Sequence, residues 1–386
     1  MKNKKTYPIA VPNISGNERK YLNDCIDSEF VSSVGPFVDQ FEDKLQKCSF
    51  FKYASAVSSG TSALSLAQHV LGVKYNDLVI IPDYTFIATA NSVKQNQADT
   101  WLIDIEQDNL NIDMQLVIDE ISRYCKFFKG KWIHKISKQE LKCVIPVMAL
   151  GNFISSSDID NFNEKIGLPL IIDAAGALGT SNDKHKLGEL DILAATISFN
   201  GNKTFTCGGG GAILTNHKRF HDKVKHLSTT ARSGYEYIHD EPAFNYRMTN
   251  VQAAIGCAQL DRFDEFLNKK RYIYEFYKKN INTNKVYFLD EGKSSHWLSY
   301  FIAKDLSKER IKELYEYSNS QGILLRPFWV PMHKQPSYKA SIKSSLENSK
   351  ALFQKVVTLP SSTSLEDTDL KKIVTIINSF FNQHCG

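Results

Sequence analysis

A single lysine, Lys203, stands in a segment whose composition is otherwise typical of a turn between two buried strands. Residues 197–211 read ISFNGNKTFTCGGGG, so Lys203 follows an apolar run and precedes four consecutive glycines. A lysine that is partly desolvated near the edge of a sheet has a lowered pKa and can act as an amine nucleophile. The alternative is an exposed turn lysine beside a flexible loop, and the glycine run matches neither GxGxxG nor a P-loop.

Two other segments could contribute to the same chemistry. In SSGTSAL, residues 58–64, a strand is expected to turn into a helix, and Gly60 would let a ligand approach the backbone. The N-terminus of that helix would suit a phosphate, although plain N-capping by serine or threonine explains such a string as well. In IIDAAGALGT, residues 171–180, Asp173 ends an apolar strand at the edge where α/β sheets bind ligands. A helix N-cap is the alternative for Asp173.

A phosphate cradle, a buried acid and a lysine, in that order on one sheet, are the parts that a pyridoxal phosphate site needs. The lysine would form the Schiff base, the acid would keep the pyridine nitrogen protonated, and the helix N-terminus would hold the phosphate. Phe86, in YTFIATAN at residues 84–91, is a candidate for the aromatic ring above the cofactor. An ordinary core aromatic is the alternative for Phe86.

The elements that must position these residues read as a mostly parallel sheet covered by helices. Short apolar runs alternate with helical patterns, and several runs are apolar at consecutive positions, as in strands buried on both faces. The expected strands are Tyr53–Val57, Leu78–Pro82, Asp99–Ile105, Lys142–Leu150, Pro169–Ala175, Ile192–Phe199 and Gly211–Thr215. The predicted fold class is therefore α/β, with a doubly wound architecture.

The length of 386 residues predicts two domains. After about residue 249 the pattern changes to helices mixed with fewer strands. We expect a large α/β domain over residues 15–250 and a small C-terminal α+β domain over residues 251–386. Residues 1–14 are assigned to the smaller domain.

Composition and charge exclude several classes of protein. The net charge is +5, and 42% hydrophobic with 23% charged residues is ordinary for a globular chain. The densest basic stretch, Lys126–Lys138, interleaves lysines with aromatic residues, as surfaces that bind nucleic acid do. We interpret it as a solvated element with its aromatic side chains packed inward, so that no nucleic-acid partner is expected.

The same reading places the chain in the cytoplasm. No apolar run approaches the roughly 20 residues of a membrane span, so no membrane partner is expected. The seven cysteines contain no CxxC pair, which predicts neither a metal site nor a disulfide framework. The basic N-terminus lacks the apolar stretch of a signal peptide.

Six segments, in the right order over nearly the whole chain, resemble the motifs of the DegT/DnrJ/EryC1/StrS aminotransferases, the nucleotide-sugar branch of fold-type I pyridoxal phosphate enzymes. They are FVSSVGPFVDQFE (30–42), SSGTSAL (58–64), PDYTFIATAN (82–91), IIDAAGALG (171–179), SFNGNKTFTCGGGGAILT (198–215) and FNYRMTNVQAAIGCAQL (244–260). The resemblance implies the aspartate aminotransferase-like fold, with a large mostly parallel sheet domain and a small α+β C-terminal domain.

The resemblance also implies a role for each matching residue. The cofactor-binding positions are Gly60, Thr61, Phe86, Asp173, Ser198, Lys203 and Asn245. Among them, Lys203 would be the Schiff-base lysine and proton shuttle, Asp173 the partner of the pyridine nitrogen, and Phe86 the stacking ring. Gly60, Thr61 and Ser198 would hold the phosphate. Asn245 would reach the phosphate of the neighbouring subunit, which implies a homodimer with shared active sites.

One position departs from the family, and two segments point to a branch of it. Gly176 stands where the family usually has a glutamine that contacts the cofactor's ring oxygen. Residues 11–35 and 326–338 resemble the LegC-type enzymes, which act on nucleotide-linked 4-keto-6-deoxy-hexoses for nonulosonic acids and related surface glycans. Candidates for the sugar-nucleotide pocket, or alternatively for simple strand–loop packing, are Arg247, Arg326, Trp329 and His333.

The predicted reaction is a transamination in which L-glutamate supplies the amino group and a nucleotide-linked keto sugar receives it. In a few members of the family a histidine replaces the lysine and the reaction becomes a dehydration, so Lys203 favours transamination. A dehydratase or isomerase using the same cofactor is one alternative. A non-catalytic regulatory protein that kept the fold is another, and the presence of both Lys203 and Asp173 disfavours it.

Overall fold

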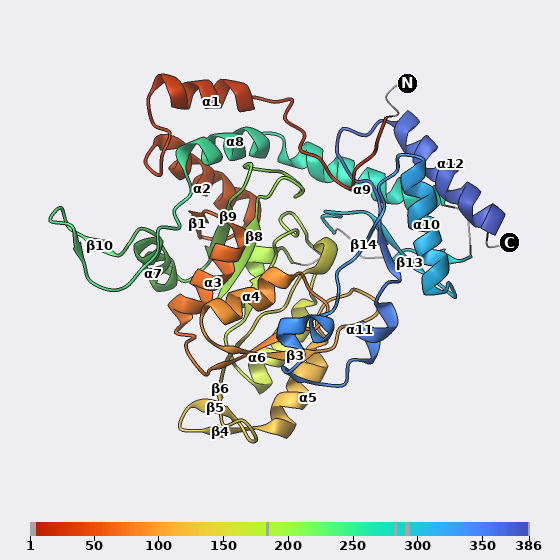
Figure 1. Ribbon diagram of the computed structural model, residues 1–386. Coiled ribbons are helices and arrows are strands. Elements are labelled where there is room, and N and C mark those ends of the chain that lie inside the picture. Colours follow the sequence, from red (N-terminus) through yellow and green to blue (C-terminus); the bar gives the residue numbers. More distant parts are fainter. Residues whose placement is uncertain (1–4, 183–184, 282–283, 290–293, 385–386) are drawn as a thin grey trace.

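The main body of the protein contains a six-stranded and a four-stranded sheet. Figure 1 shows the computed structural model, which describes residues 5–182, 185–281, 284–289 and 294–384. The six-stranded sheet has the order β15 (Ile342–Lys343), β3 (Asp99–Ile103), β2 (Leu78–Pro82), β6 (Glu140–Val144), β5 (Lys131–His134) and β4 (Cys125–Phe128). The four-stranded sheet has the order β1 (Tyr53–Val57), β9 (Gly211–Thr215), β8 (Ala194–Ser198) and β7 (Ile171–Asp173).

The two sheets continue into one another through parallel pairing. Single parallel bridges join Val144 to Leu170 and Val147 to Asp173, next to β6 and β7. The pairs β15–β3, β3–β2, β2–β6 and β7–β8 are parallel, whereas the hairpin strands β4–β5–β6 and the strands β1–β9–β8 pair antiparallel. The mostly parallel α/β sheet predicted from the apolar runs is confirmed.

Helices cover both faces of this sheet because its central strands are apolar at consecutive positions. In β2, Leu78 and Ile80 belong to one hydrophobic core, and Val79 and Ile81 belong to another on the opposite face. The first core contains side chains of α2 (Pro36–Ser49), α5 (Met114–Tyr124) and α6 (Ser156–Lys165). The second contains side chains of α3 (Gly60–Leu71), α4 (Ile87–Gln95) and α7 (Lys218–Ser228).

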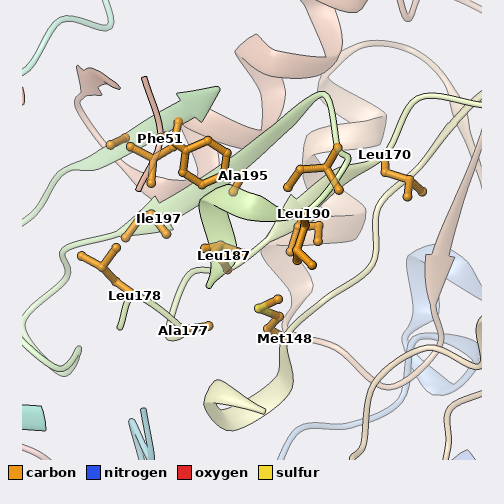
Figure 2. Packing of buried hydrophobic residues seen from close by; sticks show 14 of the residues in the cluster. Phe51, Met148, Leu170, Ala177, Leu178, Leu187, Leu190, Ala195 and Ile197 are labelled. Atoms are coloured by element: carbon orange, nitrogen blue, oxygen red, sulfur yellow. The ribbon is translucent and has the colours of Figure 1, made fainter. Parts of the chain in front are cut away.

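The first core continues beneath the strands that carry the site. Figure 2 shows Ala195 and Ile197 of β8 gathered with Leu178, Leu187 and neighbouring apolar side chains. This packing fixes the end of β8 and the turn after β7 relative to one another.

A smaller part of the chain forms a separate antiparallel sheet with its own core. Its strand order is β12 (Val286–Tyr287), β13 (Tyr300–Ala303), β16 (Val356–Thr358) and β14 (Arg326–Pro327). The helices packed with it are α9 (Phe263–Asn280), α10 (Lys308–Ser320) and α12 (Asp367–His384). The N-terminal segment joins this part, since Tyr7 pairs with Ile323 and its hydroxyl donates to Asp369.

The remaining elements connect these parts. The chain after residue 249 forms two helices, α8 (Asn250–Leu260) and α9, which are separated at Asp261–Arg262, and α8 packs against α1 (Glu18–Asp27) and α2. Division of the chain at residue 250 therefore stays a prediction. The short elements are the β10 (Arg232–Ser233) and β11 (Ile238–His239) hairpin, α11 (Glu347–Leu352) and 3-10 turns at Ala149–Gly151, Leu187–Glu189, Met332–Lys334 and Pro336–Tyr338.

The basic segment differs from its sequence-based interpretation. It forms the β4–β5 hairpin, and the rings of Phe127 and Phe128 are 63% and 55% exposed. The expectation that its aromatic side chains pack inward is wrong for these two residues. Strands alternate their side chains between two faces, and β4 is the edge strand of its sheet, so within the described residues only β5 pairs with it.

None of the helices in the described residues is long and apolar enough to cross a membrane.

We predict that Phe41→Ala lowers the free energy of unfolding by about 3–5 kcal/mol. Phe41 of α2 is fully buried, and the centre of its ring lies 5.1 Å from the centre of the Phe199 ring. Truncation therefore leaves a cavity that the surrounding strands are too rigid to fill. Urea unfolding followed by circular dichroism measures the change. Tyr75→Ala, at a side chain that is 76% exposed, is the control and should change stability by less than about 0.5 kcal/mol. Equal effects of the two substitutions would contradict this account of the core.

Candidate active site

The turn from β1 into α3 forms a cradle at the end of β8. Ser59 caps α3, because its side chain accepts a hydrogen bond from the Ser62 N–H at 3.0 Å. A Cβ atom at Gly60 would lie 2.8 Å from the Cβ of Ser198, so only glycine allows α3 to start this close to β8. The partial positive charge of the α3 N-terminus is thereby held beside the Ser198 side chain, an arrangement that suits a phosphate.

Asp173 lies at the end of β7 and is almost fully buried. One carboxylate oxygen accepts the Thr89 hydroxyl at 2.7 Å, and the other accepts the Ala175 N–H at 3.1 Å. Burial raises the pKa of Asp173, while the bonds from Thr89 and Ala175 and the charge of Lys203 oppose that rise. Both donors require an acceptor, so they support the ionised carboxylate.

Lys203 follows β8 in a tight turn, where its backbone N–H donates a hydrogen bond to the Asn200 carbonyl oxygen at 3.0 Å. Burial lowers the pKa of Lys203 to about 8, and the attraction of Asp173 works in the opposite direction. An amine with this pKa has a much larger neutral fraction near physiological pH than an ordinary lysine, and its neutral form can act as a nucleophile or base. The exposed turn lysine, the alternative left open by the sequence, does not describe this environment.

A cavity of about 290 Å³ brings these residues together. Among the expected site residues, the ones that line it are Gly60, Thr61, Phe86, Asp173, Ser198, Lys203 and Trp329. Strand order explains the convergence, because β7 and β8 are adjacent and parallel and therefore end at the same edge.

Comparison with known proteins identifies the family. Residues 12–378 match the model of the DegT/DnrJ/EryC1/StrS aminotransferase family. The chain belongs to this family. It is 35% identical to a GDP-perosamine synthase of Vibrio cholerae over 97% of this chain and 99% of that one. It is 27% identical to a UDP-4-amino-4,6-dideoxy-N-acetyl-beta-L-altrosamine transaminase of Campylobacter jejuni, over 97% and 98% of the two chains.

The solved structures support the same fold. The putative sugar aminotransferase Spr1654 of Streptococcus pneumoniae, in its PLP-form, superposes with a TM-score of 0.87 at 21% identity, covering 98% of this chain and 99% of that one. The predicted fold-type I architecture is thus confirmed.

The DegT/DnrJ/EryC1/StrS aminotransferases use pyridoxal phosphate, and the residues present here fit that group. The cradle at Gly60 and Ser198 suits its phosphate, and the buried carboxylate of Asp173 suits a protonated ring nitrogen. Lys203, on the same cavity, has the lowered pKa that a covalent attachment to an aldehyde requires.

An indole takes the place of the family's glutamine beside the cofactor site. A Cβ atom at Gly176 would lie 2.6 Å from Cε3 of Trp297, so the glycine leaves room for that ring. The Lys203 Nζ atom lies 3.6 Å from the centre of the same ring, and the Trp297 Nε1–H donates to the Asn202 carbonyl at 2.6 Å. Gly176 therefore allows a cation–π contact to the lysine, in place of an amide contact to the cofactor.

Aromatic rings form one wall of the cavity. Phe86, at the start of α4, is 52% exposed and lies 5.7 Å from Trp329, measured between ring centres. The ring centres of Trp329 and Trp297 are 6.4 Å apart. Phe86 is open to the cavity, so it is not the ordinary core aromatic that was its alternative. Stacking on the cofactor stays a prediction.

Arg326 and His333 are not among the residues that line this cavity. Arg326 is an exposed residue of β14. His333 binds Asp83, through Nδ1 to a carboxylate oxygen at 2.7 Å and through its backbone N–H to the other oxygen at 2.8 Å. This pair attaches the loop that carries Trp329 to the end of β2, so packing accounts for His333. Substrate contact by either residue stays a prediction.

Asn245 and Arg247 lie in the segment that follows the β10–β11 hairpin. Asn245 is exposed and pairs with Thr229, outside the cavity of its own chain, so its expected contact with a neighbouring subunit stays a prediction. Arg247 pairs with Val57 at the end of β1, and its Nε atom is buried without a hydrogen-bond partner in the described part of the chain.

Sequence reasoning missed Thr89 and Trp297. Thr89 sits in the YTFIATAN segment, three residues after Phe86, and a polar residue on the inner face of a helix was a signal that could have found it. Trp297 had no local signal, because its contact with Gly176 joins segments about 120 residues apart.

We predict that Gly176→Ala is destabilising and that a smaller residue at position 297 relieves the effect. The added methyl group overlaps the Trp297 ring, which typically costs about 1–3 kcal/mol. In the Trp297→Leu background the same substitution should cost less than about 0.5 kcal/mol, as a double-mutant cycle by urea unfolding would show. Additive effects of the two substitutions would contradict direct contact.

We predict that Lys203 reacts with amine reagents with a midpoint near pH 8, below that of ordinary lysines. Asp173→Asn should shift the midpoint lower still, because the carboxylate attraction that raises the pKa of Lys203 is removed. Trinitrobenzenesulfonate labelling of the cofactor-free protein across pH, read by mass spectrometry, measures both values. Exposed Lys74 is the internal control. A midpoint unchanged in Asp173→Asn would show that the two groups do not interact.

Proposed function

We propose that this protein is a nucleotide-sugar aminotransferase that converts a nucleotide-linked 4-keto-6-deoxy sugar into the corresponding 4-amino sugar, with L-glutamate as the amino donor. The observation that carries the proposal is the presence of Lys203, Asp173 and the Gly60–Ser198 cradle on a single cavity. The names of the relatives above support a sugar substrate, since one contains a 4-amino-4,6-dideoxy sugar linked to UDP and another contains GDP.

The residues of the cavity divide the chemistry among them. When bound, pyridoxal phosphate supplies a carbonyl that condenses with amines and a ring that accepts electrons. Asp173 would hold a carboxylate beside the ring nitrogen of the bound group, and the cradle would hold its phosphate. The Nζ atom of Lys203 would remove the proton from Cα of glutamate as a base, and as an acid it would deliver a proton to C4 of the sugar in the second half of the reaction.

The balance of the reaction is an exchange of groups between the two substrates. The amino group of glutamate is exchanged for the keto oxygen of the sugar, so 2-oxoglutarate and the 4-amino sugar are the products. The Trp297 ring stabilises the protonated form of Lys203 through the cation–π contact and restricts where its amine can move.

The substrate is placed by groups around the mouth of the cavity. Trp329 offers an apolar face to the sugar ring or the base, as aromatic side chains commonly do in ligand sites, and its neighbour Phe86 would stack on the cofactor ring. Arg247 is not among the residues that line the cavity, but its unpartnered Nε atom makes it a candidate donor for an anionic group of the substrate. Asn245 would reach the cofactor phosphate of the neighbouring subunit in a homodimer with shared active sites.

The biological setting follows from the substrate class. We place the enzyme in the cytoplasm, in the synthesis of a surface-glycan amino sugar such as legionaminic acid or a related one. All six cysteines within the described residues are free thiols, which suits a reducing compartment.

We predict that Lys203→Ala lowers turnover by at least about 10³-fold, because a base in direct contact with the reacting carbon typically contributes that much. The assay is the absorbance change of the cofactor on addition of L-glutamate, followed by addition of GDP-, UDP- or dTDP-linked 4-keto-6-deoxy sugars. Lys74→Ala, at an exposed lysine, is the matched control and should retain full activity.

The two halves of this assay separate the alternatives. Recovery of the original spectrum with one keto sugar, together with a 4-amino product, supports the proposal. A product formed without glutamate would instead indicate a dehydratase or isomerase. Normal turnover in Lys203→Ala would end the proposal.

A further inference from the structure

The β4–β5 hairpin presents an unusual surface at the free edge of the six-stranded sheet. Residues 125–134 form the hairpin, which projects from the body at the lower edge of the view in Figure 1. Its tip, at Lys129 and Gly130, has positive φ angles of 50° and 77° that close a tight turn between the strands. None of the residues of the proposed active site lies on it.

Three large apolar side chains are exposed on and beside this hairpin. Phe127 is 63% exposed, Phe128 is 55% exposed, and Ile136 in the following turn is 74% exposed. Apolar side chains scattered singly over a surface are normal. Three within ten residues form a local apolar group, and such groups commonly mark sites of interaction with a partner or a membrane.

The same segment carries all of the net positive charge of the chain. Residues 122–139 contain no acidic residue and six basic ones, which are Arg123, Lys126, Lys129, Lys131, Lys135 and Lys138. The whole chain has 47 basic and 42 acidic residues, so the remainder carries a net charge of −1. All six basic side chains are exposed, and the amines of Lys126 and Lys129 lie 5.6 Å and 5.4 Å from the centre of the Phe128 ring.

Protection of a sheet edge explains the lysines and leaves the phenylalanines unexplained. Exposed edge strands commonly carry lysines, because charge discourages pairing with another chain. Exposed aromatic rings have the opposite effect and favour association. Two copies of the hairpin are poor partners for one another, since two surfaces of the same high positive charge would repel.

The directions of the two phenylalanine rings discriminate between single-stranded nucleic acid and an anionic lipid surface as the partner of the hairpin. A platform for single-stranded nucleic acid stacks successive bases on rings that share one face. Phe127 and Phe128 are consecutive in a strand, so they point to opposite faces, and Phe127 contacts Trp132 across the hairpin at 5.2 Å between ring centres. A hairpin that enters a lipid interface edge-on buries both faces at once.

We infer that the β4–β5 hairpin docks the protein on an anionic phospholipid bilayer, with the phenylalanines in the interface and the basic side chains on the headgroups. Interfacial elements of this kind combine apolar burial with attraction to anionic lipid. Surface docking departs from the expectation of no membrane partner, which considered only spanning segments. It would place the enzyme near the membrane without any transmembrane helix.

The test is co-sedimentation of the full-length protein with two kinds of vesicle, one of phosphatidylcholine alone and one of equimolar phosphatidylcholine and phosphatidylglycerol. Binding is expected only to the anionic vesicles. It should weaken as salt is raised, because the screening length falls from about 10 Å at 0.1 M to about 3 Å at 1 M.

Two variants separate the contributions of charge and apolar burial. Lys126→Gln with Lys129→Gln should lower the partition coefficient about 30-fold, from the typical contribution of a lysine at an anionic surface. Phe128→Ser, which keeps every charge, should lower it about tenfold through lost apolar burial. The matched controls, at exposed positions elsewhere, are Lys308→Gln with Lys312→Gln for charge and Tyr75→Ser for the ring.

The outcomes are distinguishable from failure of the proposed enzyme function. Circular dichroism and the glutamate half-reaction should be unchanged in all of these variants, since none of them touches the cavity. Equal binding to both kinds of vesicle, or equal loss in test and control variants, would overturn the inference. Hairpin-dependent binding of a labelled single-stranded oligonucleotide, with no binding to anionic vesicles, would overturn it in favour of nucleic acid.

Discussion

The site depends on holding a carboxylate and an amine together in a place from which water is largely excluded. Either group would be costly to bury alone. Asp173 is tolerated because Thr89 and the Ala175 N–H supply its hydrogen bonds, and Lys203 because its pKa falls toward neutrality. The adjacent parallel strands β7 and β8 bring the two residues to one edge. The apolar residues that bury both faces of the sheet therefore also determine where Asp173 and Lys203 meet, at the carboxyl ends of β7 and β8.

The second constraint is spatial, and it links the smaller part of the chain to the lysine. The Trp297 ring fills the space that Gly176 leaves open. The Lys270 amine donates a hydrogen bond to the backbone carbonyl of Trp297 at 2.9 Å. Lys270 is buried without a carboxylate partner in the described residues, and burial lowers its pKa to about 7. A neutral amine can still donate two hydrogen bonds, and its second goes to the Ser361 carbonyl at 2.6 Å. Gly176, which stands where the family usually has a glutamine, and Lys270 thus act together to hold the Trp297 indole beside Lys203.

Sequence reasoning reached the parts of the site that local patterns encode. The strands β1, β2 and β9 begin and end at the residues expected from their apolar runs. β7 is shorter than expected by two residues at each end, and β8 by two residues at its start and one at its end. Lys203, Asp173 and Gly60 were recognisable because each sits in a strand exit with a characteristic neighbourhood. The Asp83–His333 pair and the Gly176–Trp297 contact were not, since each joins segments more than 100 residues apart. Only the packing of the whole chain determines such contacts.

The lysines of this protein show why composition alone could not separate its surfaces. Lys203 and Lys270 are cationic by residue type, yet burial lowers the pKa of each toward neutrality. Lys126 and Lys129 are exposed instead, and charges at a surface interact over about a Debye length. A net charge of +5 counts all four equally. The fold therefore separates a cluster of exposed basic residues on the β4–β5 hairpin from the cavity, where burial gives Lys203 an amine that can exchange protons.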